Sequence, residues 1–120
     1  FEIIQNNLFF GVGTGDFPQE YKKLNDIYTS QMPTTTHPHN MYSLIGVQLG
    51  IVGLLSLMSI FYFQIVQSFK SSNRFIRDVG ITLPLMYILI MLSDSYLLGH
   101  YTTLMFVLLS SFLYKDFEKN

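Results

Sequence analysis

The feature that most constrains the fold of this chain is a long stretch without any ionisable side chain. Residues 41–69 read MYSLIGVQLGIVGLLSLMSIFYFQIVQSF, which is 29 residues without Asp, Glu, Lys, Arg or His. A helix needs about 20 apolar residues to cross the hydrocarbon core of a bilayer, and a soluble helix of this length would carry a polar stripe. The stretch therefore predicts a transmembrane helix, and its position in mid-chain is not that of a signal peptide.

Two weaker apolar stretches follow the first. Residues 79–93 are uncharged, and the run can be extended if Asp94 is tolerated near one end. Residues 95–114 contain only His100 as an ionisable group. We therefore predict an all-α, polytopic transmembrane fragment with about three membrane spans. The predicted spans lie at about 42–67, 79–97 and 98–114.

Composition excludes several classes of function. Seven Lys and Arg stand against eight Asp and Glu, so the formal net charge is −1, whereas a nucleic-acid-binding protein normally presents a clustered basic face. Only 12% of the residues are charged, which is about half of the usual share in soluble domains. The chain contains no Cys, so it can form no disulfide framework, thiolate zinc site or thiolate nucleophile.

The positions of Lys and Arg predict which side of the membrane each loop faces. Three of the seven lie in the 70–78 loop and two follow the third span, whereas only Lys22 and Lys23 precede the first. Because cytoplasmic loops carry the excess of Lys and Arg, we expect the 70–78 loop and the C-terminus in the cytoplasm. Residues 11–40 then face the periplasm of a bacterial inner membrane. The chain accordingly divides into a periplasmic loop segment, 1–40, and a transmembrane region, 41–120.

The segment before the first span carries a glycine pattern and a short helix. Residues 11–16 read GVGTGD, and three glycines at alternate positions indicate a tight, unusual backbone. The pattern fits neither the dinucleotide-binding fingerprint nor the P-loop. Residues 17–28 predict a short amphipathic helix with Pro18 at its first position. The apolar face of that helix carries Phe17, Tyr21, Leu24 and Tyr28.

Two histidines, His37 and His39, precede the first span at its outer end. Asn40 is a good N-cap for a helix that begins at Met41, so His39 is predicted at the water–lipid boundary. The N-terminus of a helix favours anions and disfavours imidazolium, which keeps His39 able to accept a proton. The residues by themselves leave three interpretations open. These are acid–base chemistry at the membrane surface, a metal site that needs further ligands, and two loop histidines without a role.

Small and ionisable residues near the spans provide two further hypotheses. Gly46, Gly50 and Gly53 share one face of the first predicted helix, which is typical of close packing between helices rather than of chemistry. Asp94 and His100 flank the turn between the second and third spans. Ionisable groups at such places are functional candidates, although hydration or pairing with each other is the simpler interpretation.

Three motifs occur in order along the first half of the chain. They are LFFGVGTGDF at 8–17, HPHNMY at 37–42 and QLGIVGLL at 48–55. In order and spacing they resemble the C-terminal part of the O-antigen ligase and Wzy-type polysaccharide polymerase family of bacterial inner-membrane proteins. The resemblance implies that this chain, which begins with Phe, is a portion of a larger polytopic protein.

The resemblance also implies a reaction and a set of site residues. Members transfer a glycan from an undecaprenyl-diphosphate carrier to an acceptor on the periplasmic face, without a metal or other cofactor. The essential loop histidine of the family corresponds to His39 or to His37. Asn40, Gly13 and Gly15 are the predicted substrate contacts. Arginines that hold the donor diphosphate are expected on upstream helices, so the fragment by itself should be inactive.

These observations predict a fragment of an O-antigen ligase, with a loop histidine as general base. Its expected partners are the undecaprenyl-diphosphate-linked donor, a lipid A–core or glycan acceptor, membrane lipids and upstream helices, and nucleic acid is not among them. One alternative is a polysaccharide polymerase of the same family. The other is a non-catalytic transport module, for which we would expect broken helices or charges near mid-bilayer. The first predicted span shows neither, which argues against transport.

Overall fold

The computed structural model describes residues 2–29, 33 and 38–115, and within these ranges the chain is helical without any strand. The all-α prediction is thereby confirmed, whereas three membrane spans and a periplasmic loop remain predictions. Among the described helices, α3 is the one that is long and apolar enough to cross a membrane. The elements are α1 (Glu2–Asn6), α2 (Phe17–Tyr28), α3 (Met41–Lys70), α4 (Arg74–Ile90), the 3₁₀ turn η1 (Tyr96–Leu98) and α5 (His100–Leu113).

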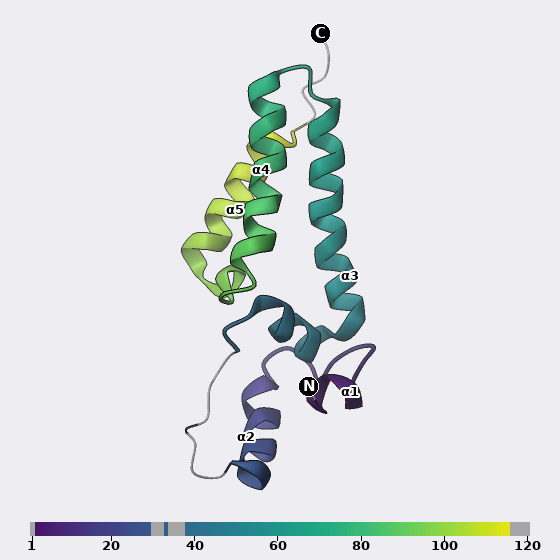
Figure 1. The fold of residues 1–120 in the computed structure, drawn as a ribbon, viewed down its shortest axis with the longest axis vertical. Helices are drawn as coiled ribbons and strands as arrows, with labels where there is room; N and C mark the ends of the chain where they lie inside the picture. Colours follow the sequence, from purple (N-terminus) through teal and green to yellow (C-terminus); the bar gives the residue numbers. More distant parts are fainter. Residues whose placement is uncertain (1, 30–32, 34–37, 116–120) are drawn as a thin grey trace.

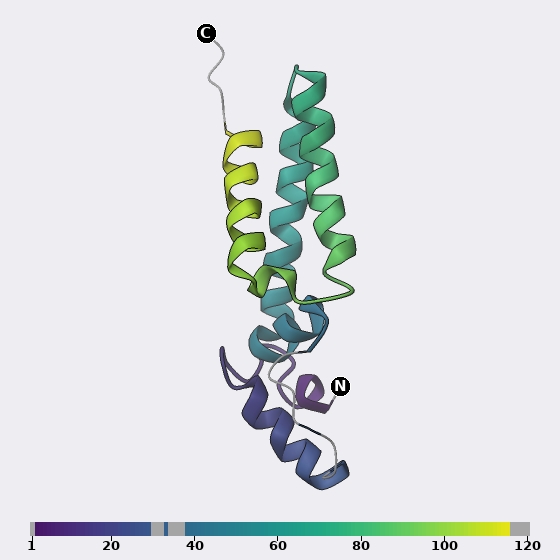
Figure 2. The same cartoon turned by 90° about the vertical axis from the view of Figure 1, so that its left-hand side faces the viewer.

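The helices α3, α4 and α5 run side by side in alternating directions, and α1 and α2 lie beyond one end of them (Figures 1 and 2). We call the end that holds residues 38–40 and 91–99 the His39 end. The opposite end holds residues 70–74 and the last turn of α5, and we call it the Arg74 end. The connection before α3 and the connection between α4 and α5 therefore lie at the His39 end, and the connection between α3 and α4 lies at the Arg74 end.

The boundaries of α4 and α5 differ from the predicted spans. α4 begins after Asn73, whose side-chain oxygen caps the N–H groups of the first turn. It ends at Ile90, so the predicted span 79–97 is not one helix. The reason is that the carbonyl oxygens of Met91 and Leu92 accept hydrogen bonds from the segment before α3 and not from a further turn of helix. α5 covers most of the predicted third span.

Aromatic side chains form the core between α3, α4 and α5. Phe61 of α3 and Met91 after α4 are almost fully buried. The ring of Phe106 on α5 lies 6.0 Å from Phe61 and 4.7 Å from Tyr87, centroid to centroid. The Tyr87 hydroxyl also donates a hydrogen bond to Thr102 O over 3.0 Å. Side-chain packing around Phe106 therefore joins α5 to both α3 and α4.

α3 is interrupted at Gly50, where φ is 63° and ψ is −158°. Figure 1 shows the change of direction near the lower end of the helix. This combination of angles is essentially restricted to glycine. We call residues 41–49 the short half and residues 51–70 the long half. The expectation of an unbroken first span is therefore wrong, and the long half alone, at about 1.5 Å per residue, is about 30 Å long.

The chain around Gly11 crosses this interruption, and we call residues 8–13 the glycine segment. It supplies partners to backbone groups at the end of the short half and at the start of the long half. The four hydrogen bonds run from Val12 N–H to Val47 O (2.8 Å), Gly13 N–H to Gln48 O (3.0 Å), Ile51 N–H to Leu8 O (2.8 Å) and Val52 N–H to Phe9 O (3.3 Å). The interruption is thus a hydrogen-bonded crossing of two backbones.

The predicted role of the glycines in α3 needs correction at this point. Gly50 does not serve packing between two straight helices, because its backbone makes the interruption and touches the glycine segment. Gly46 does pack against α1, and a Cβ there would lie at ordinary contact distance, 3.4 Å from the Ile4 side chain. The unusual backbone predicted for GVGTGD is confirmed, because Gly11, Gly13 and Gly15 all have positive φ.

Candidate functional site

The segment that carries His39 is attached to the turn after α4. Asn40 caps α3, as predicted, because its Oδ1 accepts a hydrogen bond from Ser43 N–H over 3.0 Å. Three hydrogen bonds then join this segment to the turn. They run from Met41 N–H to Met91 O (3.0 Å), from Asn40 Nδ2 to Leu92 O (3.0 Å) and from Ser95 Oγ to Pro38 O (2.6 Å). The segment and the turn therefore form one unit at the His39 end.

This attachment brings His39 and Asp94 together. Nδ1 of His39 lies 3.5 Å from Oδ1 of Asp94, and the same carboxylate oxygen accepts a hydrogen bond from Ser95 N–H over 2.7 Å. The side chains remain 76% and 45% exposed, respectively. A carboxylate beside Nδ1 favours the imidazole tautomer with its proton on Nδ1, in which Nε2 is the nitrogen that accepts a proton. A base held by a third group in this way can deprotonate a hydroxyl.

The sequence pointed to Asp94 but not to its partner. The sequence suggested hydration of Asp94 or its pairing with His100, whereas the structure places His39 beside Asp94. His100 is the first residue of α5 at the same end of the bundle. The signal available in the sequence was topological, because alternating spans put the turn after α4 on the same side as His39. The second predicted base, His37, lies outside the described residues.

The N-terminus of α3 is less open to an anion than predicted. Met41 N–H donates to Met91 O, and Ser43 N–H donates to the Asn40 side chain. Both atoms of the Asn40 amide group are also engaged, one in the cap and the other with Leu92 O. The geometry therefore gives Asn40 a structural role, and its contact with substrate stays a prediction.

Comparison with known families agrees with the motifs. Residues 1–58 match the O-antigen ligase family. All three motifs lie within this range, so the resemblance is confirmed over that segment, and an O-antigen ligase-type or polymerase-type function at a membrane follows at a coarse level. No curated protein and no solved structure matches the chain. We call residues 1–58 the ligase-family segment. It includes His39 and the glycine segment, whereas Asp94 lies beyond it.

The two predicted glycine contacts occupy different surroundings within the ligase-family segment. Gly13 is half-buried, and its N–H donates to Gln48 O in the crossing with α3. Gly15 is exposed, and a Cβ at this position would meet no atom within 4 Å. Gly13 therefore has a structural contact, and substrate binding by either glycine stays a prediction.

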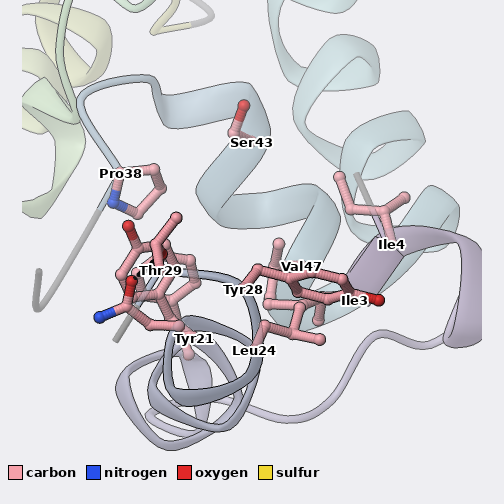
Figure 3. A pocket seen from close by; sticks show the side chains of 11 residues that line it. Ile3, Ile4, Tyr21, Leu24, Tyr28, Thr29, Pro38, Ser43 and Val47 are labelled. Atoms are coloured by element: carbon pink, nitrogen blue, oxygen red, sulfur yellow. Dashed lines mark hydrogen bonds between the residues drawn. The ribbon is translucent and has the colours of Figure 1, made fainter. Parts of the chain in front are cut away.

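A pocket of about 390 Å³ lies between α1, α2 and the short half of α3 (Figure 3). Its lining continues along the ligase-family segment to Pro38, the residue before His39. Helix α2 has the predicted bounds, but Asn25 is buried whereas Tyr28 of the predicted apolar face is 67% exposed. Apolar and aromatic side chains make up most of the lining, among them Ile4, Phe17, Tyr21 and Val47, and polar groups come from Asn25, Thr29 and Ser43.

Cationic groups are distributed unevenly between the two ends of the bundle. Arg74 and Arg77, the two arginines of the sequence, lie in the first turn of α4 at the Arg74 end. On α2 of the ligase-family segment, Lys23 forms an ion pair with Glu20 at 2.5 Å. Within the described ranges, no group of three or more His, Asp or Glu could hold a metal ion. The site residues that the structure brings together are therefore one imidazole and one carboxylate.

Proposed function

We propose that this chain carries the general base of an O-antigen ligase, which transfers an undecaprenyl-diphosphate-linked glycan to lipid A–core on the periplasmic face of the inner membrane. The observation that supports the proposal most directly is the 3.5 Å approach of His39 to Asp94. The two residues are far apart in the sequence, and one of them belongs to the segment that matches the O-antigen ligase family. The exposed imidazole can be reached by a substrate from the water side.

The reaction needs a base and a charged leaving group. The acceptor hydroxyl oxygen attacks the anomeric carbon of the donor glycan, and the bond between that carbon and the diphosphate oxygen breaks. The electron pair of this bond leaves with undecaprenyl diphosphate. Nε2 of His39 takes the proton of the hydroxyl, and Asp94 stabilises the imidazolium that forms. Base assistance of this kind contributes about 10²–10⁴-fold to the rate.

The distribution of charge supports the periplasmic location of the site. Lys70, Arg74 and Arg77 gather at the Arg74 end, which the positive-inside rule assigns to the cytoplasm. The His39 end then faces the periplasm, where a lipid-linked glycan is presented. Because both arginines are remote from His39, we infer that cations from upstream helices hold the donor diphosphate. Exposed apolar side chains such as Leu55 and Phe63 provide surfaces for those helices or for lipid.

The two alternatives are supported to different degrees. A polysaccharide polymerase would use the same base and leaving group with a carrier-linked glycan as acceptor, so the described geometry fits it equally. A transport module gains one supporting observation, because α3 is broken and transporters use broken helices. However, four backbone groups around Gly50 are hydrogen-bonded to the glycine segment, so they are not available to an ion or substrate. Group transfer is therefore the better-supported function.

The proposal is tested by replacing each member of the pair in the full-length protein. We expect His39→Ala to lower the rate of glycan transfer by about 10²-fold or more, and Asp94→Asn to lower it by a smaller factor. His100→Ala is the matched control, because it removes another exposed histidine at the same end. Transfer is measured with purified donor and acceptor in reconstituted membranes, at equal amounts of inserted protein.

Two results of this experiment would be decisive. Transfer by His39→Ala at the rate of the unchanged protein would remove His39 from the mechanism. The product separates the ligase from the polymerase, because a ligase yields glycan attached to lipid A–core, whereas a polymerase yields longer glycans on the carrier.

A further inference from the structure

The short half of α3 is held at both of its ends. At its beginning, Met41 N–H donates to Met91 O, and the Tyr42 hydroxyl donates to Ile88 O over 2.7 Å. At its end, Val47 O and Gln48 O accept hydrogen bonds from the glycine segment. The short half is therefore a rigid link between the glycine segment and the turn that carries Asp94.

The direction of this link depends on the backbone angles of Gly50. An L-residue with a Cβ would avoid φ 63° and ψ −158°, and the simplest alternative is a continuous helix through the interruption. The nine residues of the short half extend about 14 Å, at about 1.5 Å per residue. A change of direction at Gly50 would therefore displace the segment around His39 from the turn around Asp94.

A second glycine is required on the other side of the crossing. A Cβ on Gly50 would lie 2.7 Å from Leu8 O and closer still to Phe9 O, and a Cβ on Gly11 would lie 2.5 Å from Gln48 O. All of these neighbours are backbone atoms, which cannot rotate away as a side-chain end can. The two backbones pass each other only because both positions lack a side chain.

We infer that Gly50 and Gly11 are positioning residues for the His39–Asp94 pair. Neither glycine reaches the reacting groups. Together they fix the direction of the short half, and the short half keeps the imidazole in front of the carboxylate. The inference rests on the proposed function of the pair. It states that the crossing at Gly50, some ten residues from His39 along the chain, affects the rate of glycan transfer.

The geometric part is tested with a pair of cysteines, since the chain contains none of its own. Ser95 Oγ lies 2.6 Å from Pro38 O, so Pro38→Cys and Ser95→Cys introduce thiols on neighbouring backbones. In the full-length protein, we expect Gly50→Ala to slow disulfide formation between them by about tenfold or more, because a changed direction of the short half relieves the backbone strain of a Cβ at these angles and separates the two thiols. Gly46→Ala is the matched control in the same half, because its Cβ makes only an ordinary contact.

The catalytic part is tested in two ways. The kinetics of glycan transfer are measured in proteins without the cysteines, and rescue is measured in proteins that carry the cysteine pair. We expect Gly50→Ala to lower kcat by about 10²-fold with little change in KM for the donor, whereas Gly46→Ala leaves both unchanged. When the cysteine pair is oxidised in the Gly50→Ala protein, transfer should recover, and reduction should abolish the recovery. A variant that had merely lost its fold would not be rescued by one local bond.

The outcomes separate this inference from the proposed function. If Gly50→Ala and Gly11→Ala both form the disulfide at the rate of Gly46→Ala, the positioning role is wrong, whatever His39→Ala does. If disulfide formation slows but transfer continues at its normal rate, the crossing has no catalytic consequence and the inference is also overturned. If His39→Ala remains active, the proposed function fails independently of the disulfide result. Both glycine variants are compared at equal amounts of inserted protein, so that a loss of insertion is not counted as a loss of transfer.

Discussion

The two halves of α3 have similar composition but differ in how far backbone hydrogen bonds to other segments anchor them. The long half packs through side chains such as Leu57 and Phe61, which are almost completely buried against the other helices. The short half also buries side chains, among them Leu44 and Val47, and in addition its ends are fixed by hydrogen bonds, to Met91 O at one end and from Val12 and Gly13 at the other. One continuous apolar stretch of sequence therefore contains a membrane-length helix and a separately anchored segment that directs the site.

The contrast follows from what each half must satisfy. A regular helix pairs its own backbone groups, so it needs only apolar partners for its side chains. An interrupted helix leaves N–H and C=O groups without intrahelical partners, and near a membrane these groups need partners from the protein. The glycine segment supplies those partners at Gly50. Backbone contacts at the short half should consequently tolerate substitution much less than polar contacts of the long half.

The largest expected effect is that of Gly11→Ala. The new Cβ would meet backbone atoms of Gln48, and φ of Gly11 is +67°. A Cβ cannot rotate away from the contact, and neither can the Gln48 backbone. We expect a loss of about 3–5 kcal/mol in the free energy of unfolding, measured by denaturation of the chain in detergent micelles.

Gly15→Ala is the matched control for Gly11→Ala. It also has positive φ, but a Cβ there meets no atom within 4 Å. Only backbone strain of about 1–2 kcal/mol should remain. Equal losses for the two variants would show that conformational strain, and not the crossing with α3, determines the effect.

A smaller effect is expected at the beginning of the short half, for Asn40→Ala. This substitution removes the cap on Ser43 N–H and the hydrogen bond to Leu92 O. Loss of an N-cap costs about 1 kcal/mol, and a lost hydrogen bond about another 0.5–1.5 kcal/mol. Thermal unfolding in detergent should therefore show a destabilisation of about 1.5–2.5 kcal/mol.

Asn40→Asp separates the two contributions of Asn40, because a carboxylate keeps the capping acceptor but loses the donor to Leu92 O. It should fall between the unchanged protein and Asn40→Ala. If Asn40→Asp were as unstable as Asn40→Ala, the cap would contribute nothing, and the attachment to the turn after α4 would carry the whole effect.

Local signals in the sequence were sufficient for several elements. Pro18 and the apolar spacing gave the bounds of α2, and Asn40 gave the beginning of α3, because caps and helical periodicity act over a few residues. The three motifs gave the resemblance to the O-antigen ligase family, and the match over residues 1–58 confirms it for that segment. These predictions succeeded because each depends on neighbours within one or two helical turns.

The interruption of α3 and the partner of His39 were not predicted because both depend on contacts between distant segments. Gly50 lies in an apolar helical pattern, and only the approach of Leu8 and Phe9 shows why it leaves the helix. Asp94 becomes the neighbour of His39 only once the turn after α4 bonds to the segment before α3. A single sequence does not give the distance between segments that are far apart along the chain. The alternating direction of the spans did, however, predict that His39 and Asp94 lie at the same end.

The smallest expected effect lies in the long half, at Gln64. This side chain is buried, donates to Ser110 Oγ over 3.0 Å, and leaves its Oε1 without a hydrogen-bond partner among the described residues. Gln64→Leu removes one interhelical hydrogen bond, worth about 0.6 kcal/mol in membrane proteins, and also removes the unpaired oxygen, whose burial costs about 1–3 kcal/mol. Ser110 Oγ only accepts this bond, so in either protein its own O–H can donate to a carbonyl of its own helix, as Ser68 and Ser111 do. The free energy of unfolding in detergent should stay constant or rise by about 1–2 kcal/mol, whereas Gln64→Ala, which leaves a cavity, should lower it.

A loss of more than about 1 kcal/mol for Gln64→Leu would mean that the long half also depends on a polar contact, and the contrast between the two halves of α3 would no longer hold.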